Sequence, residues 1–365
     1  MDSFACPLPP AGDATVLLGH GGGGSLSQRL LDQLLVPAFG PADGVLHDAA
    51  VLPAAAGPLA FSTDSYVVRP LFFPGGDIGS LAVYGTVNDL AMVGASALAL
   101  SLSLILEEGL PMAVLQQVVA SIRFAAQRCG VPVVTGDTKV VERGKGDGIY
   151  INTAGIGRVD HGLVIGPKAV RSGDAILVSG DLGRHGVAIL AARQELGFRT
   201  QLCSDLAPLH KPVQALLAAG LELHCLRDLT RGGLASALHE IGRGAGLGVL
   251  VRENAIPIAP QVDAACELLG LDPLAMANEG RFVLFLPANE AERALELLRR
   301  FEASAAIIGS VRGEPVLGEA LLGEPVLGEP VLGEAVLGEA VLLENSLGLH
   351  RRLEMGRGEQ LPRIC

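Results

Sequence analysis

Apolar residues in the first half of the chain follow two alternating periodicities, which predict helices and strands in turn. Leucines recur at helical spacing within 25–39 after a capping serine, whereas 97–106 alternates apolar and small polar residues as a strand does. These criteria predict helices at 25–39, 77–94 and 115–130, and strands at 14–18, 59–68, 97–106 and 131–141. Two of the strands, 59–68 and 131–141, also carry polar residues.

The alternation of strand and helix patterns begins again near Lys168 and predicts a second unit that contains both helices and strands. Strands are expected at 171–180, 280–287, 305–311 and 340–345, helices at 185–196 and 290–301, and a strand, a loop and a helix across 223–246. We therefore predict an α+β fold of two α/β domains, 1–165 and 166–312, of which the first is rich in β-structure. A low-complexity insertion, 313–342, precedes the final strands and a flexible tail, 343–365.

The insertion is a pentamer, GE(P/A)(V/L)L, that repeats from Gly313 to Leu342. A period of five residues matches neither the 3.6 of a helix nor the 2 of a strand. We interpret it as an expansion in a surface loop between the strands at 305–311 and 340–345. The alternative is a strap that binds a partner through its Val-Leu pairs, as in a non-enzymatic scaffold protein.

Charge and composition exclude several classes of partner. The chain has 27 Lys and Arg against 39 Asp and Glu, a net charge of −12, so nucleic acid and anionic membranes are not its main partners. The longest uncharged run, 90–106, is shorter than the roughly 20 residues that span a bilayer. The first ten residues lack the pattern of a secretory signal, and no CxxC pair occurs. We therefore expect a cytoplasmic protein with reduced cysteines.

Four aspartates stand at the polar ends of predicted strands or in tight loops, each beside Thr, Asn or Gly. They are Asp64 in FSTDSY, Asp89 in TVNDLA, Asp137 in TGDTKV and Asp228 in RDLTRGG. Each one alone is typical of a helix cap or a turn. Together they indicate a site for Mg²⁺ and a nucleotide, because hard divalent cations prefer carboxylate oxygens and bridge to phosphates.

A glycine-rich stretch, GHGGGG at 19–24, fits the G-x-G-x-x-G fingerprint of dinucleotide-binding proteins, with Asp43 downstream. Any run of four glycines fits that template, so an NAD(P)-dependent oxidoreductase is a weaker alternative that leaves the aspartates unexplained. The chain has no G-x-x-x-x-G-K-[ST] motif, which excludes a P-loop ATPase. A flexible glycine loop that closes over phosphates would agree with both the glycine-rich stretch and the absence of a P-loop motif.

Four further residues are candidates for chemistry. Lys139 is suited to neutralise phosphate charge or act as a base, and Glu279 in MANEGRF to transfer protons. His20 is an isolated histidine, which is more often structural than catalytic. Cys365, in the closing stretch GEQLPRIC, is a thiol that could carry a covalent group, since disulfide pairing is the weaker explanation of a cysteine in this context.

Read together, these stretches resemble the HypE family of hydrogenase maturation factors. The resemblance rests on GHGGGGSLSQ, FSTDSYVVRPLFFPGGDIGSLAVYGTVNDLAMVGA, VTGDTKVVERG, DLGRHGVAILAAR, RDLTRGGLASALHEI, ANEGRFV and GEQLPRIC. HypE belongs to an ATP-binding superfamily with aminoimidazole ribonucleotide synthetase, selenophosphate synthetase and thiamine-monophosphate kinase. The resemblance implies this superfamily's two-domain fold and a homodimer formed through the β-rich first half.

The resemblance also implies an activity. HypF carbamoyltransferase would place a carbamoyl group on Cys365, and ATP would drive its dehydration to a thiocyanate, an S-cyanide that supplies the cyanide ligand of [NiFe] hydrogenase iron through a HypC–HypD scaffold. Metal and nucleotide would be held by Asp64, Asp89, Asp137 and Asp228, with Asn88 and Thr138 beside the nucleotide. Lys139 and Glu279 would remove protons, and His20 would line the approach of the tail.

Overall fold

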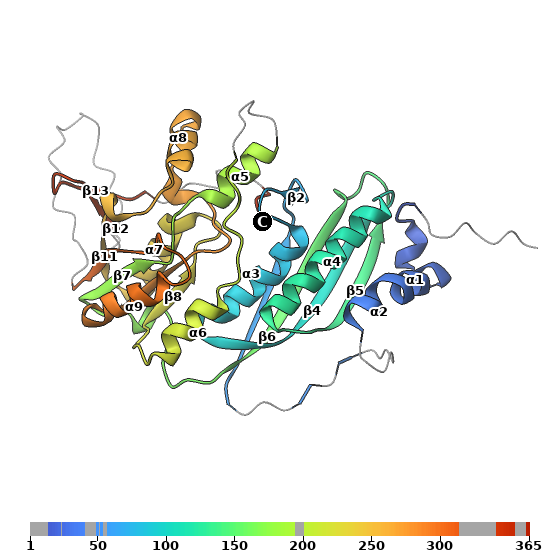
Figure 1. Cartoon of the computed structure of the whole chain (residues 1–365), viewed down its shortest axis with the longest axis horizontal. Coiled ribbons are helices and arrows are strands. Elements are labelled where there is room, and N and C mark those ends of the chain that lie inside the picture. The colour runs from blue at the N-terminus through green and yellow to red at the C-terminus, as the bar shows by residue number, and fades with distance from the viewer. Residues whose placement is uncertain are drawn as a thin grey trace, which may run out of the picture.

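The structure, a computed structural model, describes residues 14–22, 24–40, 49–50, 52–53, 57–193, 201–313, 341–354 and 363–365. They form two units, each a sheet with helices packed on it (Figure 1). The last strand of the first sheet ends at Val159 and the first strand of the second begins at Asp174. The boundary expected near residue 165 falls in the connection between them.

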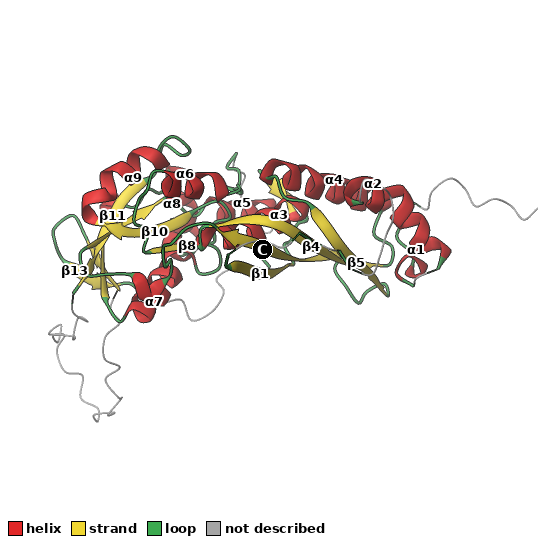
Figure 2. Cartoon of the chain, turned by 90° about the horizontal axis from the view of Figure 1, so that it is seen from below, coloured by secondary structure: helices red, strands yellow, loops and turns green. Residues whose placement is uncertain are grey.

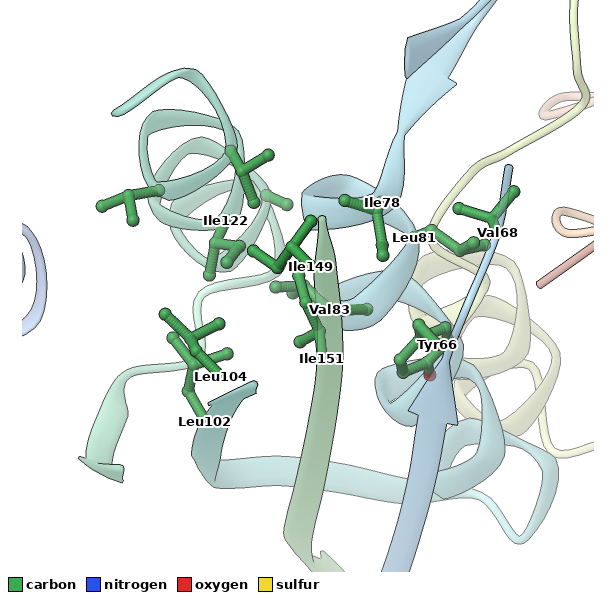
Figure 3. Close-up of a cluster of buried hydrophobic side chains, with 14 of the residues drawn as sticks. Tyr66, Val68, Ile78, Leu81, Val83, Leu102, Leu104, Ile122, Ile149 and Ile151 are labelled. Atoms are coloured by element: carbon green, nitrogen blue, oxygen red, sulfur yellow. The ribbon is translucent and has the colours of Figure 1, made fainter. Parts of the chain in front are cut away.

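The first sheet has the order β1-β6-β4-β5. Its strands are β1 (Leu59–Tyr66), β4 (Ala95–Glu107), β5 (Val133–Val141) and β6 (Ile149–Val159), and the hairpin β2 (Phe72–Phe73) and β3 (Gly76–Asp77) lies beside it. Helices α3 (Ile78–Met92) and α4 (Met112–Cys129) cover one face. Ile78, Leu81 and Val83 on α3 and Ile122 on α4 meet Leu104 of the sheet in a core that excludes water (Figure 3).

Asp77 begins α3, because its carboxylate accepts the N–H groups of Gly79 and Ser80 at 2.7 and 3.0 Å. These bonds satisfy donors that a helix start leaves unpaired. Nearly every side chain of α3 is buried, between the first sheet on one side and the second unit on the other. This helix therefore joins the two units.

The second sheet has the order β13-β12-β9-β11-β7-β10-β8. The strands are β7 (Asp174–Val178), β8 (Cys225–Asp228), β9 (Gly248–Arg252), β10 (Phe282–Pro287), β11 (Ala306–Arg312), β12 (Val341–Glu344) and β13 (His350–Arg352). Helices α6 (His210–Ala218) and α9 (Ala291–Leu298) pack on one face, and α7 (Gly233–Ala245) packs on the other. Helices α5 (Arg184–Ala192) and α8 (Pro260–Leu269) form a smaller cluster at one end of this unit.

Most predicted elements occur where expected, and one strand prediction is wrong. Residues 14–18 form only a single bridge, Thr15 to Pro111, before a 3₁₀ turn, η1 (Leu18–Gly21). The helix expected at 25–39 is present as α1 (Ser25–Leu30), a π-helical turn (Leu31–Leu35) and α2 (Val36–Phe39). The pentamer repeat lies almost wholly outside the described residues. No described helix is long and apolar enough to cross a membrane.

No helix of the described residues packs on the face of the first sheet opposite α3 and α4 (Figure 2). Large apolar side chains lie on it: Leu59, Phe61 and Ile105 have exposed fractions of 58%, 70% and 41%. Between them lie small or polar side chains, among them Ser101 and Asn152. We call this surface, formed by the outward side chains of β1, β6, β4 and β5, the open face.

Candidate functional site

Acidic side chains from both units converge beside α3. Asp64 lies on the α3-facing side of β1, Asp89 lies near the end of α3, and Asp228 ends β8. Glu279 and Asp205 come from loops of the second unit. We call these five residues the acidic cluster, because burial and then the charges of the other four raise the pKa of Glu279.

Burial and repulsion raise the pKa of three members of the cluster, Asp89, Asp228 and Glu279. Burial, and then the charges of Asp89 and Asp64, raises the pKa of Asp228 to about 7. Burial also raises the pKa of Asp89, although the Ser62 hydroxyl donates to its carboxylate at 2.6 Å and opposes the change. The pKa of Glu279 is raised well above its usual range, mainly by burial. Such a site favours a cation that offsets the repulsion.

The residues fit a Mg²⁺ ion bound together with phosphates. Within the part of the chain that the structure describes, Glu279 Oε1 is buried without a hydrogen-bond partner, so one carboxylate oxygen is available for another ligand. No three His, Cys, Asp or Glu side chains there converge tightly enough to hold a metal by themselves. Mg²⁺ usually takes one or two carboxylates, keeps waters and completes its shell with substrate phosphates.

Asn88, expected beside the nucleotide, is buried where α3 meets the loops of the second unit. Its side chain is 2% exposed. Its Nδ2 donates to the carbonyls of Ala207 at 3.1 Å and Glu279 at 3.5 Å, while its Oδ1 accepts from the N–H of Leu209 at 2.7 Å. The amide therefore holds the loops of the second unit against α3 and supports the backbone of Glu279.

The structure does not bring Asp137, Thr138 and Lys139 to the acidic cluster. They lie on β5, three strands from β1 in the sheet order, a separation of about 14 Å at the usual strand spacing. Asp137 pairs in register with Ser103 on β4, and Ser103 pairs with Asn152 on β6. Paired residues point to the same side of a sheet, so the side chain of Asp137 lies on the open face. There Lys139 Nζ binds Asp137 at 2.8 Å, and the lysine side chain is 62% exposed.

His20 also lies at this edge of the sheet and not beside residues 363–365. Its ring is 4% exposed, and its Nδ1 accepts the N–H of Leu17 at 2.9 Å. A Cβ on Gly21 would lie 2.5 Å from the backbone nitrogen of Val140, so this glycine lets η1 pack directly on β5. No strand precedes the glycines within 14–22, which contradicts the dinucleotide fingerprint; Asp43 lies outside the described residues.

Residues 363–365 contact both units, and Figure 1 shows the C-terminus between them. Their backbone pairs with the chain that follows β1: Val67 N–H donates to the carbonyl of Cys365 at 3.0 Å, and Arg69 N–H to that of Arg363 at 3.2 Å. Ile364 is 4% exposed and belongs to the first core. Cys365 is thus held beside Val67, three residues along the chain from Asp64.

Side chains from both units fasten this segment. Arg363 forms an ion pair with Asp147 and donates to the carbonyl of Val67 at 3.1 Å. From the second unit, Arg193 donates to the carbonyl of Arg363, and His185 Nε2 lies 2.8 Å from the carbonyl oxygen of Ile364. These contacts were missed at the sequence level, because they join residues more than a hundred positions apart.

Both halves of the chain match known domains. The N-terminal domain model of AIR synthase related proteins matches residues 46–159, and the C-terminal domain model matches 171–320. The fold, with an acidic site between its two units, therefore defines an AIR synthase related protein of two α/β domains.

The relatives narrow the class to one family. The chain is 47% identical over 351 residues to carbamoyl dehydratase HypE of Cupriavidus necator, covering 95% of this chain and 94% of that protein. A crystal structure of HypE in complex with ATP has a TM-score of 0.87 and 47% identity, covering 96% of this chain and 100% of that chain. A HypE–HypF complex gives 0.74 and 39%, covering 90% and 99%. The chain belongs to the HypE family.

The raised pKa of Asp228 predicts how Mg²⁺ acts on stability. Because the folded state binds this proton more tightly than the unfolded state, stability falls as pH rises from the ordinary value of 3.8 through about 7. Mg²⁺ favours the ionised carboxylates, so it should raise the melting temperature more at about pH 8 than at about pH 6. Thermal unfolding at both pH values, with and without Mg²⁺, measures this; an equal shift contradicts it.

Proposed function

We propose that this protein is an ATP-dependent carbamoyl dehydratase that acts on its own Cys365. The carbamoyl group, carried there as an S-carboxamide, loses water to become an S-cyanide, which supplies the cyanide ligand of [NiFe] hydrogenase iron. One observation carries the proposal: Cys365 is docked between the units, and Val67, which binds its carbonyl, follows β1 three residues after Asp64 of the acidic cluster. The HypE structure with ATP supports the nucleotide.

The proposed reaction balances with ATP as the only co-reactant. The amide oxygen attacks the γ-phosphorus of ATP, ADP departs, and the oxygen becomes part of a good leaving group. Loss of the two N–H protons then forms the C≡N bond as phosphate leaves; one proton ends on that phosphate and the other passes through Glu279 to solvent. The products are the S-cyanide, ADP, phosphate and one proton, and the sulfur of Cys365 stays bonded to carbon throughout.

Within this reaction each part of the acidic cluster has a task. Asp64, Asp89 and Asp228 would hold Mg²⁺, which when bound neutralises phosphate charge. Glu279 accepts a proton from the amide nitrogen. Its buried, repelled carboxylate is a stronger base than an exposed one, and a bound cation favours the ionised form that the step needs.

The positions of Asp137 and Lys139 support the homodimer, which we propose forms through the open face. In one chain Lys139 lies on the open face while Glu279 lies beside α3, so the two cannot act on one carbamoyl group unless a second chain supplies one of them. A sheet face with exposed Leu59, Phe61 and Ile105 is typical of a surface that another chain covers.

A single charge on the open face should separate the dimer. Phe61→Glu would bury a carboxylate against the second copy, so we expect a monomer, measured by light scattering after size exclusion. Phe124→Glu is the matched control, because Phe124 on α4 is 62% exposed and lies on the helical side. A monomeric parent protein, or a Phe61→Glu variant that remains dimeric, contradicts the proposed interface.

The partners follow from the same chemistry. We propose HypF as the carbamoyl donor, supported by the structure of a HypE–HypF complex in the same family. We propose a HypC–HypD scaffold as the acceptor of the cyanide. Because Ile364 is buried in the docked state, the segment 363–365 must leave its docked position to meet either partner.

ATP consumption tests the proposed function. Protein carbamoylated on Cys365 should release about one phosphate per chain in a single turnover, whereas protein without the carbamoyl group should release little. NAD should not raise the melting temperature, and ATP with Mg²⁺ should. Phosphate release that is independent of carbamoylation would contradict the dehydratase.

A further inference from the structure

His185 is fully buried at the start of α5, yet it contacts the docked segment. Its ring packs edge-on against Phe73 with centroids 5.4 Å apart. Its two nitrogens have separate partners: Nδ1 lies 2.8 Å from Ser204 Oγ, and Nε2 lies 2.8 Å from the carbonyl oxygen of Ile364.

The partners define which nitrogen carries the hydrogen. Ser204 Oγ accepts the N–H of Leu206 at 3.0 Å, so its own hydrogen is available for His185 Nδ1. The carbonyl of Ile364 can only accept, so Nε2 carries the hydrogen that it needs. Burial lowers the pKa of His185, which agrees with this neutral form.

Asp205 joins His185 to Glu279. Its Oδ1 accepts the backbone N–H of His185 at 3.0 Å. Its Oδ2 accepts the backbone N–H groups of Glu279 at 3.1 Å and Gly280 at 2.9 Å. One carboxylate, 7% exposed, therefore holds both the helix that carries the imidazole and the loop that carries the proposed proton acceptor.

We propose that His185 and Asp205 are positioning residues. His185 places the Cys365 thiol by binding the carbonyl of Ile364, and Asp205 fixes the position of His185 relative to Glu279. The inference rests on the proposed function, since it assigns a partner group to that same site. The peptide unit from Ile364 to Cys365 is planar, so fixing its carbonyl leaves the thiol only the torsions of Cys365 itself. Such restriction raises the fraction of encounters in reactive geometry.

The first test measures access to the thiol. Without the carbamoyl group, alkylation of Cys365 by iodoacetamide, followed by site-resolved mass spectrometry, should be about tenfold faster in His185→Asn, which cannot reach the carbonyl. His185→Gln should restore the slow rate, because its terminal amide nitrogen reaches the position of Nε2. His224→Asn is the matched control, since His224 is 2% exposed and bonds Asp174 and Glu222.

General loosening of the fold is detected in the same samples. Cys225 is 1% exposed, and burial raises the pKa of its thiol to about 12, so it should stay unmodified while the fold is intact. Fast alkylation of Cys365 with protected Cys225 supports the proposal. Unchanged alkylation in His185→Asn, or an equal increase in His224→Asn, overturns the role of His185.

The second test addresses the shared support. Asp205→Asn offers one acceptor oxygen where three N–H groups need partners, so Cys365 alkylation should rise and the single-turnover dehydration rate should fall together, by about tenfold each. A fall in the dehydration rate with unchanged alkylation of Cys365 overturns the claim that Asp205 positions both His185 and Glu279. The alkylation experiment needs no carbamoyl group. A parent protein that consumes no ATP would therefore overturn the proposed function, while the alkylation rates would still test the role of His185.

Discussion

Replacing Glu279 with glutamine is expected to slow the dehydration of carbamoylated Cys365 by about 10³-fold, the usual contribution of a positioned proton acceptor. The substitution keeps the size of the side chain and the backbone bonds to Asp205 and Asn88, so the loop should keep its place. ATP should still bind, because the amide removes one of several carboxylates. Single-turnover kinetics at saturating ATP measures the loss.

Glu253→Gln provides the control for this substitution. Glu253 is half-exposed and pairs with Arg351, remote from the acidic cluster, so its loss should leave the rate unchanged. A Glu279→Gln variant that keeps the parent rate within a few fold would show that another group accepts the proton. A variant that no longer binds ATP would place Glu279 among the nucleotide ligands instead.

The second large effect is expected at Asp228. Asn cannot ionise, so Asp228→Asn removes the cost of burying a charge whose pKa is raised from 3.8 to about 7. At about pH 8 the variant should be more stable by up to about 4 kcal/mol, at roughly 1.4 kcal/mol per unit of pKa. Its Mg²⁺-dependent activity should fall sharply, the trade between stability and function that is common at active sites.

Denaturant unfolding at two pH values checks the stability gain. The variant's advantage should shrink as pH falls below the pKa of Asp228, because the parent carboxyl is then protonated as well. Asp160→Asn is the control: Asp160 is half-exposed beside Arg158, so its replacement should change stability little. A destabilised Asp228→Asn variant would contradict the repulsive cluster.

Much of the fold could be predicted because local pattern and tertiary packing agree. The apolar residues of 77–94 and 97–106 predict α3 and β4; α3 is buried nearly throughout, and β4 has one buried face. Strand β6 was missed, although its polar and apolar residues alternate, as the burial of Ile149–Val159 shows. The strand expected at 14–18 was wrong because its apolar residues pair only with a loop at Leu110 and Pro111.

The candidate site was predicted in part, for a topological reason. Asp64 within β1, Asp89 within α3 and Asp228 at the end of β8 meet the loop residue Glu279 beside α3, and each had been singled out from its local sequence. Asp137 has the same local pattern, but the order β1-β6-β4-β5 places it at the opposite edge and on the open face. Asp205 was missed because the loop before α6 has no periodicity or motif, and only folding places it between His185 and Glu279.

Site-resolved mass spectrometry of Cys365 tests the central claim most directly. The parent protein and the Glu279→Gln variant are each incubated with HypF, carbamoyl phosphate, ATP and Mg²⁺. The peptide that contains Cys365 should carry the full carbamoyl mass in the slow variant, and that mass less one water in the parent. Modification of a different cysteine, or a parent peptide that keeps the full carbamoyl mass, would contradict the dehydratase.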